Sequence, residues 1–455
     1  MVAVDHLQAA TAADVVARIE RLPVSAWHVK ARIIIGVATF FDAFDALAIA
    51  FVLPVLAPLW KLAGPQIGFL ISAGYLGQLA GALLFSWIAQ RFGRVRALVW
   101  SILVLSVMSL ACAFAWDYQS LLVFRTLQGL GLGGEVPIAA VYISEITRAK
   151  GRGRFVLLYE LVFPIGLVGA GLLARWVVPS FGWQYMFVIG AVPAFLVVLM
   201  QRQLPESPRW LAARGRAREA EAALAIIERE TEKSLHQPLP PVQAALAVPD
   251  RPAGWSDLFG PKYLRRTLVV WTIWFGAYLV TYGLTVWLPT IYRTVFQLPL
   301  EQSLQYGLIT QFVGLLGTLT CALTIDRFGR RPWFALAFVG AAVPLAALWF
   351  IGAQSALRVL TLVSVAFFFS SVVSIGAYLY TPELYPTRAR AMGVGVATAW
   401  LRFASMIGPT VVGLMIGGGL ENVFLAFGAI SAVAAIVTAA FAVETKNRVL
   451  EEISP

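Results

Sequence analysis

Long apolar runs alternate with short polar segments along almost the whole chain of 455 residues. A helix needs about 20 consecutive, mostly apolar residues to cross the hydrocarbon core of a bilayer. The pattern predicts twelve such spans, at 33–56, 66–89, 97–115, 120–143, 155–178, 183–201, 266–289, 304–325, 334–352, 358–381, 392–416 and 421–443. We therefore expect an all-α membrane protein with twelve transmembrane helices.

Charged motifs close several of the apolar runs, and each motif occurs twice at a nearly constant separation. The paired positions are 90–94 with 326–330, Glu145 with Glu383, and Glu206 with Glu444. The two members of a pair lie 236 to 238 residues apart. Such a repeat predicts two pseudo-symmetric bundles of six helices each, an arrangement typical of secondary transporters.

One polar stretch is much longer than the others and separates the two bundles. It contains a helical pattern from Arg214 to Glu232, and the prolines from Pro238 onward end any helix. A short amphipathic helix is also expected ahead of the first span, near Ala12 to Leu22. The expected segments are an N-terminal segment 1–32, a first bundle 33–201, an intracellular helical linker 202–265, a second bundle 266–443 and a tail 444–455.

Composition and charge agree with a membrane protein. Hydrophobic residues make up 59% of the chain and charged residues 13%, whereas a soluble domain has roughly 25% charged residues. The net charge of +11 does not indicate nucleic-acid binding, because nearly all Lys and Arg outside the spans lie in one set of alternating loops. The opposite loops hold only Lys61, Arg175, Arg293 and Arg358. This positive-inside bias predicts that both termini are cytoplasmic.

Other classes of function find little support in the sequence. The chain has no G-x-x-x-x-G-K-[ST] run of a nucleotide-binding loop, and the linker carries no catalytic constellation. His6, His28 and His236 all lie outside the predicted spans, which argues against a metal site. Cys112 and Cys321 fall in apolar spans of different halves and are expected to be packed rather than disulfide-bonded. We expect a monomeric protein with no enzyme activity, no cofactor and no metal, driven by an ion gradient.

Six motifs follow one another in a characteristic order. They are Arg91 to Arg94, Arg125 with Gly129 to Glu135, Pro205 to Trp210, Asp326 to Arg331, Pro382 to Arg388, and Glu444 to Lys446. Together they resemble the major facilitator superfamily, and within it the sugar-porter and organic-ion branch. The resemblance covers nearly the whole chain. It implies a multi-pass protein of the inner membrane that moves a small molecule across the lipid bilayer by alternating access.

The charged motifs at the loops resemble the cytoplasmic gate of that superfamily. There, Arg and acidic residues pair across the two bundles while the cytoplasmic face is closed, and exposed ion pairs worth roughly 0–1 kcal/mol each open easily. Gln90 stands where the family usually has Asp, so one contact of the gate is expected to be neutral or missing. The alternative is that these charges only solubilise the loops. The expected gate residues are Arg91, Arg94, Glu145, Arg148, Glu206, Asp326, Arg327, Arg330, Glu383, Arg388 and Glu444.

Two acids lie in the first span, where charge is costly. Asp42 and Asp45 are three residues apart and therefore share one face of a helix. An ionised acid at the centre of a bilayer costs roughly 2.5–3.5 kcal/mol, so such residues usually line a polar pathway. Removal from water and mutual repulsion both favour a protonated carboxyl, as proton coupling requires. The alternative is a permanent ion pair with a nearby Arg. Further proton-coupling candidates are Glu135 and Glu160.

Arg402 lies midway along the eleventh span. A guanidinium stays protonated and matches the two oxygens of a carboxylate, so it predicts an anion site. The resemblance implies the same, because organic-anion members of the superfamily use a similar Arg to contact the acid group of the substrate. Arg125 is expected to be structural. The other candidates for substrate binding are Asp45, Gln128, Tyr159, Tyr278, Tyr282 and Gln311.

The repeat breaks at these midplane charges. Adding the repeat offset to Asp42 and Asp45 leads to Tyr278–Gly283, which contain no acid, and Arg402 has no basic counterpart in the first half. The acids and Arg402 together resemble the bacterial niacin transporters and the aromatic-acid:proton symporters, so a small aromatic monocarboxylate such as nicotinate is the expected substrate, taken up with protons. The alternatives are a sugar or polyol porter, an organic-ion facilitator without proton coupling, or a membrane nutrient sensor.

Overall fold

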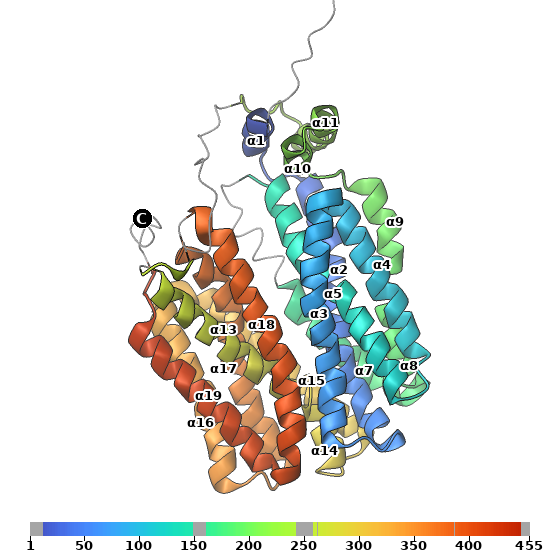
Figure 1. The fold of residues 1–455 in the computed structure, drawn as a ribbon, viewed down its shortest axis with the longest axis vertical. Helices are drawn as coiled ribbons and strands as arrows, with labels where there is room; N and C mark the ends of the chain where they lie inside the picture. The colour runs from blue at the N-terminus through green and yellow to red at the C-terminus, as the bar shows by residue number, and fades with distance from the viewer. Residues whose placement is uncertain (1–11, 149–160, 243–257, 262, 386, 447–455) are drawn as a thin grey trace, which may run out of the picture.

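The computed structural model describes residues 12–148, 161–242, 258–261, 263–385 and 387–446, and the described part is helical throughout. Two groups of helices lie side by side and are coloured blue to green and yellow to red in Figure 1. The first half contains α2 (Ala26–Leu59), α3 (Gly64–Phe92), α4 (Arg94–Ala113), α5 (Tyr118–Ile146), α7 (Val162–Phe181), α8 (Gln184–Gly190) and α9 (Ala194–Gln203). The second half contains α13 (Leu264–Thr285), α14 (Leu288–Thr294), α15 (Leu300–Phe328), α16 (Arg330–Ile351), α17 (Ala356–Glu383), α18 (Thr387–Met415), the short η1 (Ile416–Gly418) and α19 (Leu420–Phe441).

Eleven helices or helix pairs in the described part are long and apolar enough to cross a membrane. They correspond to eleven of the predicted spans. The remaining prediction, 120–143, falls on α5, which is 29 residues long but is not among the eleven. Its buried face carries Arg125, Gln128 and Glu135, which lower its hydropathy. The number of twelve transmembrane helices therefore stays a prediction.

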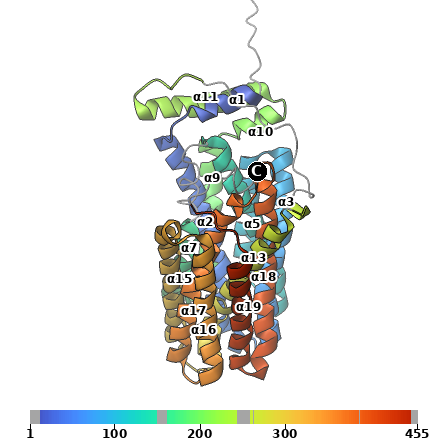
Figure 2. The same cartoon turned by 90° about the vertical axis from the view of Figure 1, so that its left-hand side faces the viewer.

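Three short helices form a separate layer beyond one end of the bundle. Figures 1 and 2 show α1 (Ala12–Glu20), α10 (Pro208–Ala213) and α11 (Ala217–Leu235) together at this end. We name this end of the molecule the linker end and the opposite end the far end. Both helices that the sequence predicted outside the bundles, near 12–22 and 214–232, are confirmed.

Ion pairs hold this layer together, and apolar packing attaches it to the first half, because its hydrophobic cluster also contains Trp27 and Ile34 of α2. Val15 and Ile19 of α1 are fully buried in one hydrophobic cluster with Leu224 and Ile227 of α11. An amphipathic helix of nine residues is too short to be stable alone in water, so this packing is what keeps α1 helical.

Glycines bring α3 and α5 into backbone contact. A Cβ atom at Gly77 would lie 2.0 Å from the carbonyl oxygen of Thr126, and one at Gly133 would lie 2.0 Å from that of Gln78. No side chain larger than hydrogen fits at these positions without a shift of the backbone. The two helices are therefore held in a fixed relation within the first half.

The two halves contact each other through α3 with α18, α7 with α15, and α2 with α14. Toward the far end, Ser72 on α3 donates a hydrogen bond to the carbonyl of Met406 (2.5 Å) and lies 2.7 Å from the hydroxyl of Thr410, both on α18. Beyond them, a Cβ atom at Gly68 would lie 2.8 Å from the carbonyl oxygen of Pro409. We name this contact between α3 and α18 the far-end seal.

Both cysteines are free and buried, as predicted. Cys112 lies on α4 and Cys321 on α15, so each belongs to the packing of its own half. Among the residues that the structure describes, no group of three or more His, Cys, Asp or Glu side chains could hold a metal ion.

Candidate functional site

A cavity of about 100 Å³ lies between the two halves, lined by residues of α5, α7, α13, α15, α17 and α18. An apolar cavity of about 150 Å³ in another protein accommodates benzene. At about 100 Å³ this cavity is smaller than that one, so it offers at most the space of one aromatic ring, and it is far below the roughly 300–1,000 Å³ of pockets for larger ligands.

Arg402 is the charged residue in the lining of this cavity. It lies near the middle of α18, and its Nη1 donates a hydrogen bond to Oε1 of Gln78 on α3. Within the described residues the Arg402 side chain has no other hydrogen-bond partner. Since a guanidinium carries five N–H donors, most of them remain available to a ligand.

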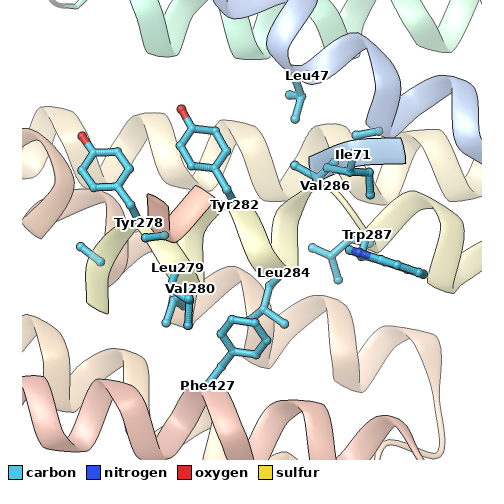
Figure 3. Packing of buried hydrophobic residues seen from close by; sticks show 14 of the residues in the cluster. Leu47, Ile71, Tyr278, Leu279, Val280, Tyr282, Leu284, Val286, Trp287 and Phe427 are labelled. Carbon is cyan, nitrogen blue, oxygen red and sulfur yellow. The ribbon is translucent and has the colours of Figure 1, made fainter. Parts of the chain in front are cut away.

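Three more of the predicted substrate residues line the cavity, namely Tyr278, Tyr282 and Gln311. Figure 3 shows Tyr278 and Tyr282 pointing to the same side of α13, away from Leu279 and Val280. Their rings are stacked at an interplanar angle of 18°, with centroids 6.0 Å apart. The two tyrosines are one helical turn apart, so the helix itself places both rings against the cavity.

The polar groups of these residues differ in how they are satisfied. The hydroxyl of Tyr278 donates a hydrogen bond to the carbonyl of Ser374 at 3.2 Å. In the described part of the chain, the side chains of Tyr282 and Gln311 make no hydrogen bond, although only 7% and 4% of these residues are exposed. Buried polar groups normally have partners, so these two fit groups that bind a ligand or water.

Asp42 is 2% exposed and lies within the electrostatic range of Arg402 and Asp45. Its Oδ1 has no hydrogen-bond partner among the described residues. Burying a carboxylate without donors costs far more free energy than burying a protonated carboxyl. The structure thus brings an acid from the first half close to the guanidinium of the second half.

Asp45 belongs to a separate network inside the first half. Its Oδ2 accepts a hydrogen bond from Ser109 (2.9 Å), whose own oxygen accepts one from Nε2 of Gln128 at 2.5 Å. Arg125 donates to Oε1 of Gln128 (2.6 Å) and to the backbone carbonyl of Asp45 (3.2 Å). Arg125 therefore ties α5 to α2, as a structural residue does, without forming an ion pair with the Asp45 carboxylate.

This network does not include the cavity wall. Asp45 and Gln128 were expected to bind substrate, but neither lines the cavity, and Gly190 of α8 packs directly against Oδ1 of Asp45. Asp45 contacts residues of α4, α5 and α8. It lies about 300° around α2 from Asp42, which leaves the two carboxyls near each other but with different neighbours. The spacing of three residues places the two acids near each other on α2. It does not imply that both carboxyls are equally accessible to a ligand.

The other predicted residues of the site lie elsewhere. Glu135 is fully buried on α5, where its Oε1 accepts a hydrogen bond from Thr39 at 3.0 Å, and it does not line the cavity. Tyr159 and Glu160 lie outside the described residues.

The charged motifs meet at the linker end of each half. In the first half, Arg94 pairs with Glu145 at 2.8 Å, and the carboxylate of Glu206 accepts hydrogen bonds from the backbone N–H groups of Arg94 (2.7 Å) and Val95 (3.2 Å). Glu206 therefore caps the N-terminus of α4, where a negative charge is stabilised by the helix dipole. The preceding Gly93 has φ = +113°, and a Cβ atom there would collide with the Glu206 carboxylate.

The second half repeats this arrangement. Arg330 pairs with Glu383 at 2.9 Å, and Glu444 accepts hydrogen bonds from the backbone N–H groups of Arg330 and Arg331, both at 3.0 Å. Tyr142 and Tyr380 also correspond, since their hydroxyls donate to the carbonyls of Pro205 and Val443, both at 2.8 Å. The sequence repeat is thus a repeat of the same hydrogen-bonded corner.

The corners differ where the sequences differ. Arg330 also pairs with Asp326 at 2.8 Å, whereas the equivalent contact of Arg94 is to the backbone carbonyl of Ala89 at 2.9 Å. Gln90, which replaces the acid, contributes its backbone carbonyl to Trp210 and Arg214 instead. The missing charge of the first motif is compensated by the main chain.

Every ion pair in the part of the chain that the structure describes joins residues of one half or of its linker layer. The predicted gate residues that form ion pairs here do so within their own halves, and a role across the halves stays a prediction. These residues are Arg94, Glu145, Asp326, Arg330 and Glu383. Arg91 packs over Trp87 and Phe92. The side chain of Arg388 lies outside the described part.

Gln78 is the residue that the sequence did not single out. It is an amide in the middle of the apolar span 66–89, whose other amide, Gln66, lies at its first residue, and it matches no motif. The only signal was that a polar side chain inside a membrane span usually has a partner or a function. Its partner, Arg402, is 324 residues away in the sequence, so the pair becomes visible only in three dimensions.

Two membrane bundles around a central cavity with one guanidinium in its lining define a transporter rather than an enzyme. The chain matches the family "Sugar (and other) transporter" over residues 35–455 and belongs to it. It is therefore a multi-pass protein of the inner membrane and a member of the major facilitator superfamily, as predicted.

Individual relatives are similar over almost their full length. The chain is 34% identical over 450 residues to the niacin transporter NiaP of Acinetobacter baylyi, covering 97% of this chain and 99% of the relative. It is 29% identical over 426 residues to the 4-hydroxybenzoate transporter PcaK of the same organism, covering 92% and 91%. The inward-open structure of the xylose transporter XylE from E. coli superposes with a TM-score of 0.70 at 18% identity, covering 94% and 99%, which confirms the fold.

Proposed function

We propose that this protein takes up a small aromatic monocarboxylate, with nicotinate as the first candidate, together with protons. The observation that carries the proposal is Arg402 in a cavity for one ring, with most of its donors unused. The stacked Tyr278 and Tyr282 offer a flat aromatic surface, and Gln311 offers an amide. The printed names of the relatives, a niacin and a 4-hydroxybenzoate transporter, support the same class of substrate.

Asp42 provides a reason for coupling to protons. An ionised Asp42 near Arg402 cancels the positive charge of the site, whereas a protonated Asp42 leaves that charge for the substrate carboxylate. Asp45, which is 0% exposed, adds a second acid on the same helix. One proton and one anion would then enter together, which keeps the buried site close to neutral. The pair can share one proton, so the coupling is assigned to both acids.

The gate residues would act at the linker end, which we assign to the cytoplasm together with both termini. The charge pattern of the loops supports this orientation. The corners of Glu206 and Glu444 would move with their halves as rigid units, because each acid is bonded to the backbone of its own half.

Uptake of labelled nicotinate into proteoliposomes tests the proposal. An inward proton gradient should accelerate uptake, and Arg402→Ala should reduce kcat/KM by about 30-fold or more, since truncating one partner of a buried charge pair costs about 2–5 kcal/mol. Arg175→Ala is the matched control, because it removes an exposed Arg that makes no ion pair or hydrogen bond with the described residues. Asp42→Asn should permit counterflow but abolish the response to the proton gradient.

Two results would contradict the proposal. Normal uptake by Arg402→Ala would remove the anion site, and uptake that ignores the proton gradient would remove the coupling. Uptake of xylose in place of nicotinate would favour the sugar or polyol porter.

A further inference from the structure

A hydrogen bond between two side chains joins the two halves at the wall of the cavity, beside the ring contact of Tyr75 on α3 with Tyr282 on α13. Gln78 on α3 accepts a hydrogen bond from Nη1 of Arg402 on α18, and neither side chain has another hydrogen-bond partner among the described residues. Gln78 is 2% exposed, whereas Arg402 lines the cavity. The amide therefore occupies part of the guanidinium that the proposed function assigns to the substrate.

The backbone of Gln78 is fixed within the first half. A Cβ atom at Gly133 of α5 would lie 2.0 Å from the carbonyl oxygen of Gln78, and one at Gly129 would lie 3.0 Å from its nitrogen. Such close packing leaves α3 no freedom to follow a movement of α18. When the halves move relative to each other at this level, the contact between Gln78 and Arg402 has to break.

The contact also lies at one end of the far-end seal. Gln78 and Arg402 are near the middle of their helices, and the contacts of Ser72 with Met406 and Thr410 lie on the far-end side of them. Among the hydrogen bonds of the described residues, the contact of Gln78 with Arg402 is the one between α3 and α18 nearest the linker end. It is thus the part of the seal that a ligand in the cavity can reach.

We propose that the amide of Gln78 holds Arg402 while no substrate is bound there and is replaced by the carboxylate of the substrate. A carboxylate can bind a guanidinium through two charged hydrogen bonds, each roughly twice as strong as a neutral one, so it displaces the amide. A neutral carboxamide has no such advantage over Gln78. Only an anionic ligand then loosens the cavity end of the far-end seal. This inference rests on the proposed function, because it requires Arg402 to bind the carboxylate.

Equilibrium binding to the full chain in nanodiscs tests the role of Gln78, with nicotinate and nicotinamide as the two probes in titration calorimetry. Gln78→Ala removes the competing acceptor, so the Kd for nicotinate should fall by about 3- to 10-fold, the range expected for one net hydrogen bond. Gln78→Glu supplies a permanent carboxylate to Arg402, so that Kd should rise at least about tenfold. Nicotinamide binding should change little in Gln78→Ala.

The opposite signs separate this role from a structural one, because a destabilised fold would weaken binding in both variants. Ser72→Ala is the matched control. It removes hydrogen bonds from the same seal without touching Arg402, so the ratio of the two Kd values should stay as in the wild type. Thermal unfolding of each variant verifies that it is folded.

The outcomes distinguish the two proposals. If nicotinate and benzoate both fail to bind, or bind equally well to Arg402→Ala, the proposed function is wrong and the role of Gln78 with it. If binding depends on Arg402 but is equal in wild type and Gln78→Ala, or is weakened by both substitutions of Gln78, the role of Gln78 alone is wrong.

Discussion

Glu228 on α11 holds the short helix α1 against α11, and neutralising the Glu228 carboxylate should release α1. Its Oε2 lies 2.6 Å from Nη2 of Arg18, and its Oε1 lies 2.7 Å from Nη2 of Arg21. The side chain of Glu228 is 12% exposed, and those of Arg18 and Arg21 are 22% and 20% exposed. Solvent therefore screens these pairs less than ordinary surface pairs.

The size of the effect follows from these contacts. Hydrogen bonds to charged groups contribute about 1.5–3 kcal/mol each, and Glu228→Gln keeps one acceptor oxygen while losing the charge. We expect a loss of about 2–3 kcal/mol in the docking of α1. Because 1.4 kcal/mol corresponds to a factor of ten, the open population should rise by about 30- to 150-fold.

The same carboxylate gives a pH dependence. Burial by itself raises the pKa of Glu228, but the hydrogen bonds from Arg18 and then Arg21 outweigh it, so the pKa in the folded protein lies below its ordinary value of 4.5. A lowered pKa means that the docking energy is fully present above pH 4.5 and is lost as the pH falls through the folded pKa. At neutral pH the docking should not respond to pH through this group.

Hydrogen exchange of the protein in nanodiscs measures this docking, after correction for the intrinsic rate at each pH. The amides of α1 should exchange about 30- to 150-fold faster in Glu228→Gln at pH 7. Glu219→Gln is the control, since Glu219 lies on the same helix and pairs with Arg216 on the exposed surface. Equal exchange of α1 in wild type and Glu228→Gln would refute the reasoning, because the apolar contacts and the ion pairs of Arg18 with Glu221 and of Glu20 with Arg209 would then suffice to hold the helix.

Two further predictions concern the packing of the bundles. Glu206→Ala and Glu444→Ala each remove a cap from a helix N-terminus and should lower the free energy of unfolding by about 1–2 kcal/mol. The two losses should be similar because both acids accept hydrogen bonds from the first backbone N–H groups of a helix. Thermal unfolding in detergent measures this, and a large effect of one substitution with none of the other would contradict the prediction. Gly133→Ala places a Cβ atom 2.0 Å from a backbone oxygen of α3 and should lower the free energy of unfolding by about 1–3 kcal/mol or prevent expression. Gly417→Ala is the control and should be neutral, because open space surrounds that position. Equal yield and unfolding temperature for both variants would show that α3 and α5 can separate.

The lengths of the apolar runs were sufficient to predict the positions of the membrane helices, because a bilayer demands about 20 apolar residues for each crossing. Of the twelve predicted spans, only the one on α5 is not apolar enough to count as a candidate membrane helix in the structure, since Arg125, Gln128 and Glu135 give it a polar face. These groups are tolerated because they are buried against other helices, and no hydropathy average records that environment. The helices α1 and α11 were likewise predicted, since their apolar residues recur at helical spacing.

The candidate site was predicted only in part. Arg402, Tyr278 and Tyr282 were identified because a charge or a pair of hydroxyls at helical spacing stands out in an apolar span. Asp45 and Gln128 stand out equally, yet they belong to a network with Ser109 and Arg125 away from the cavity. The direction of a side chain relative to a neighbouring helix depends on how the helices are rotated against each other, and no local pattern gives that rotation.

The sequence by itself determined the class of protein, its two repeated halves and the charges that break the repeat. These properties depend on composition, periodicity and spacing, which act locally along the chain. Only the tertiary structure decided that the repeated charges pair within their halves, that Asp42 rather than Asp45 lies toward Arg402, and that Gln78 reaches Arg402. Each of these depends on contacts between helices far apart in the sequence, which are set by the packing of whole helix surfaces rather than by the properties of any one segment.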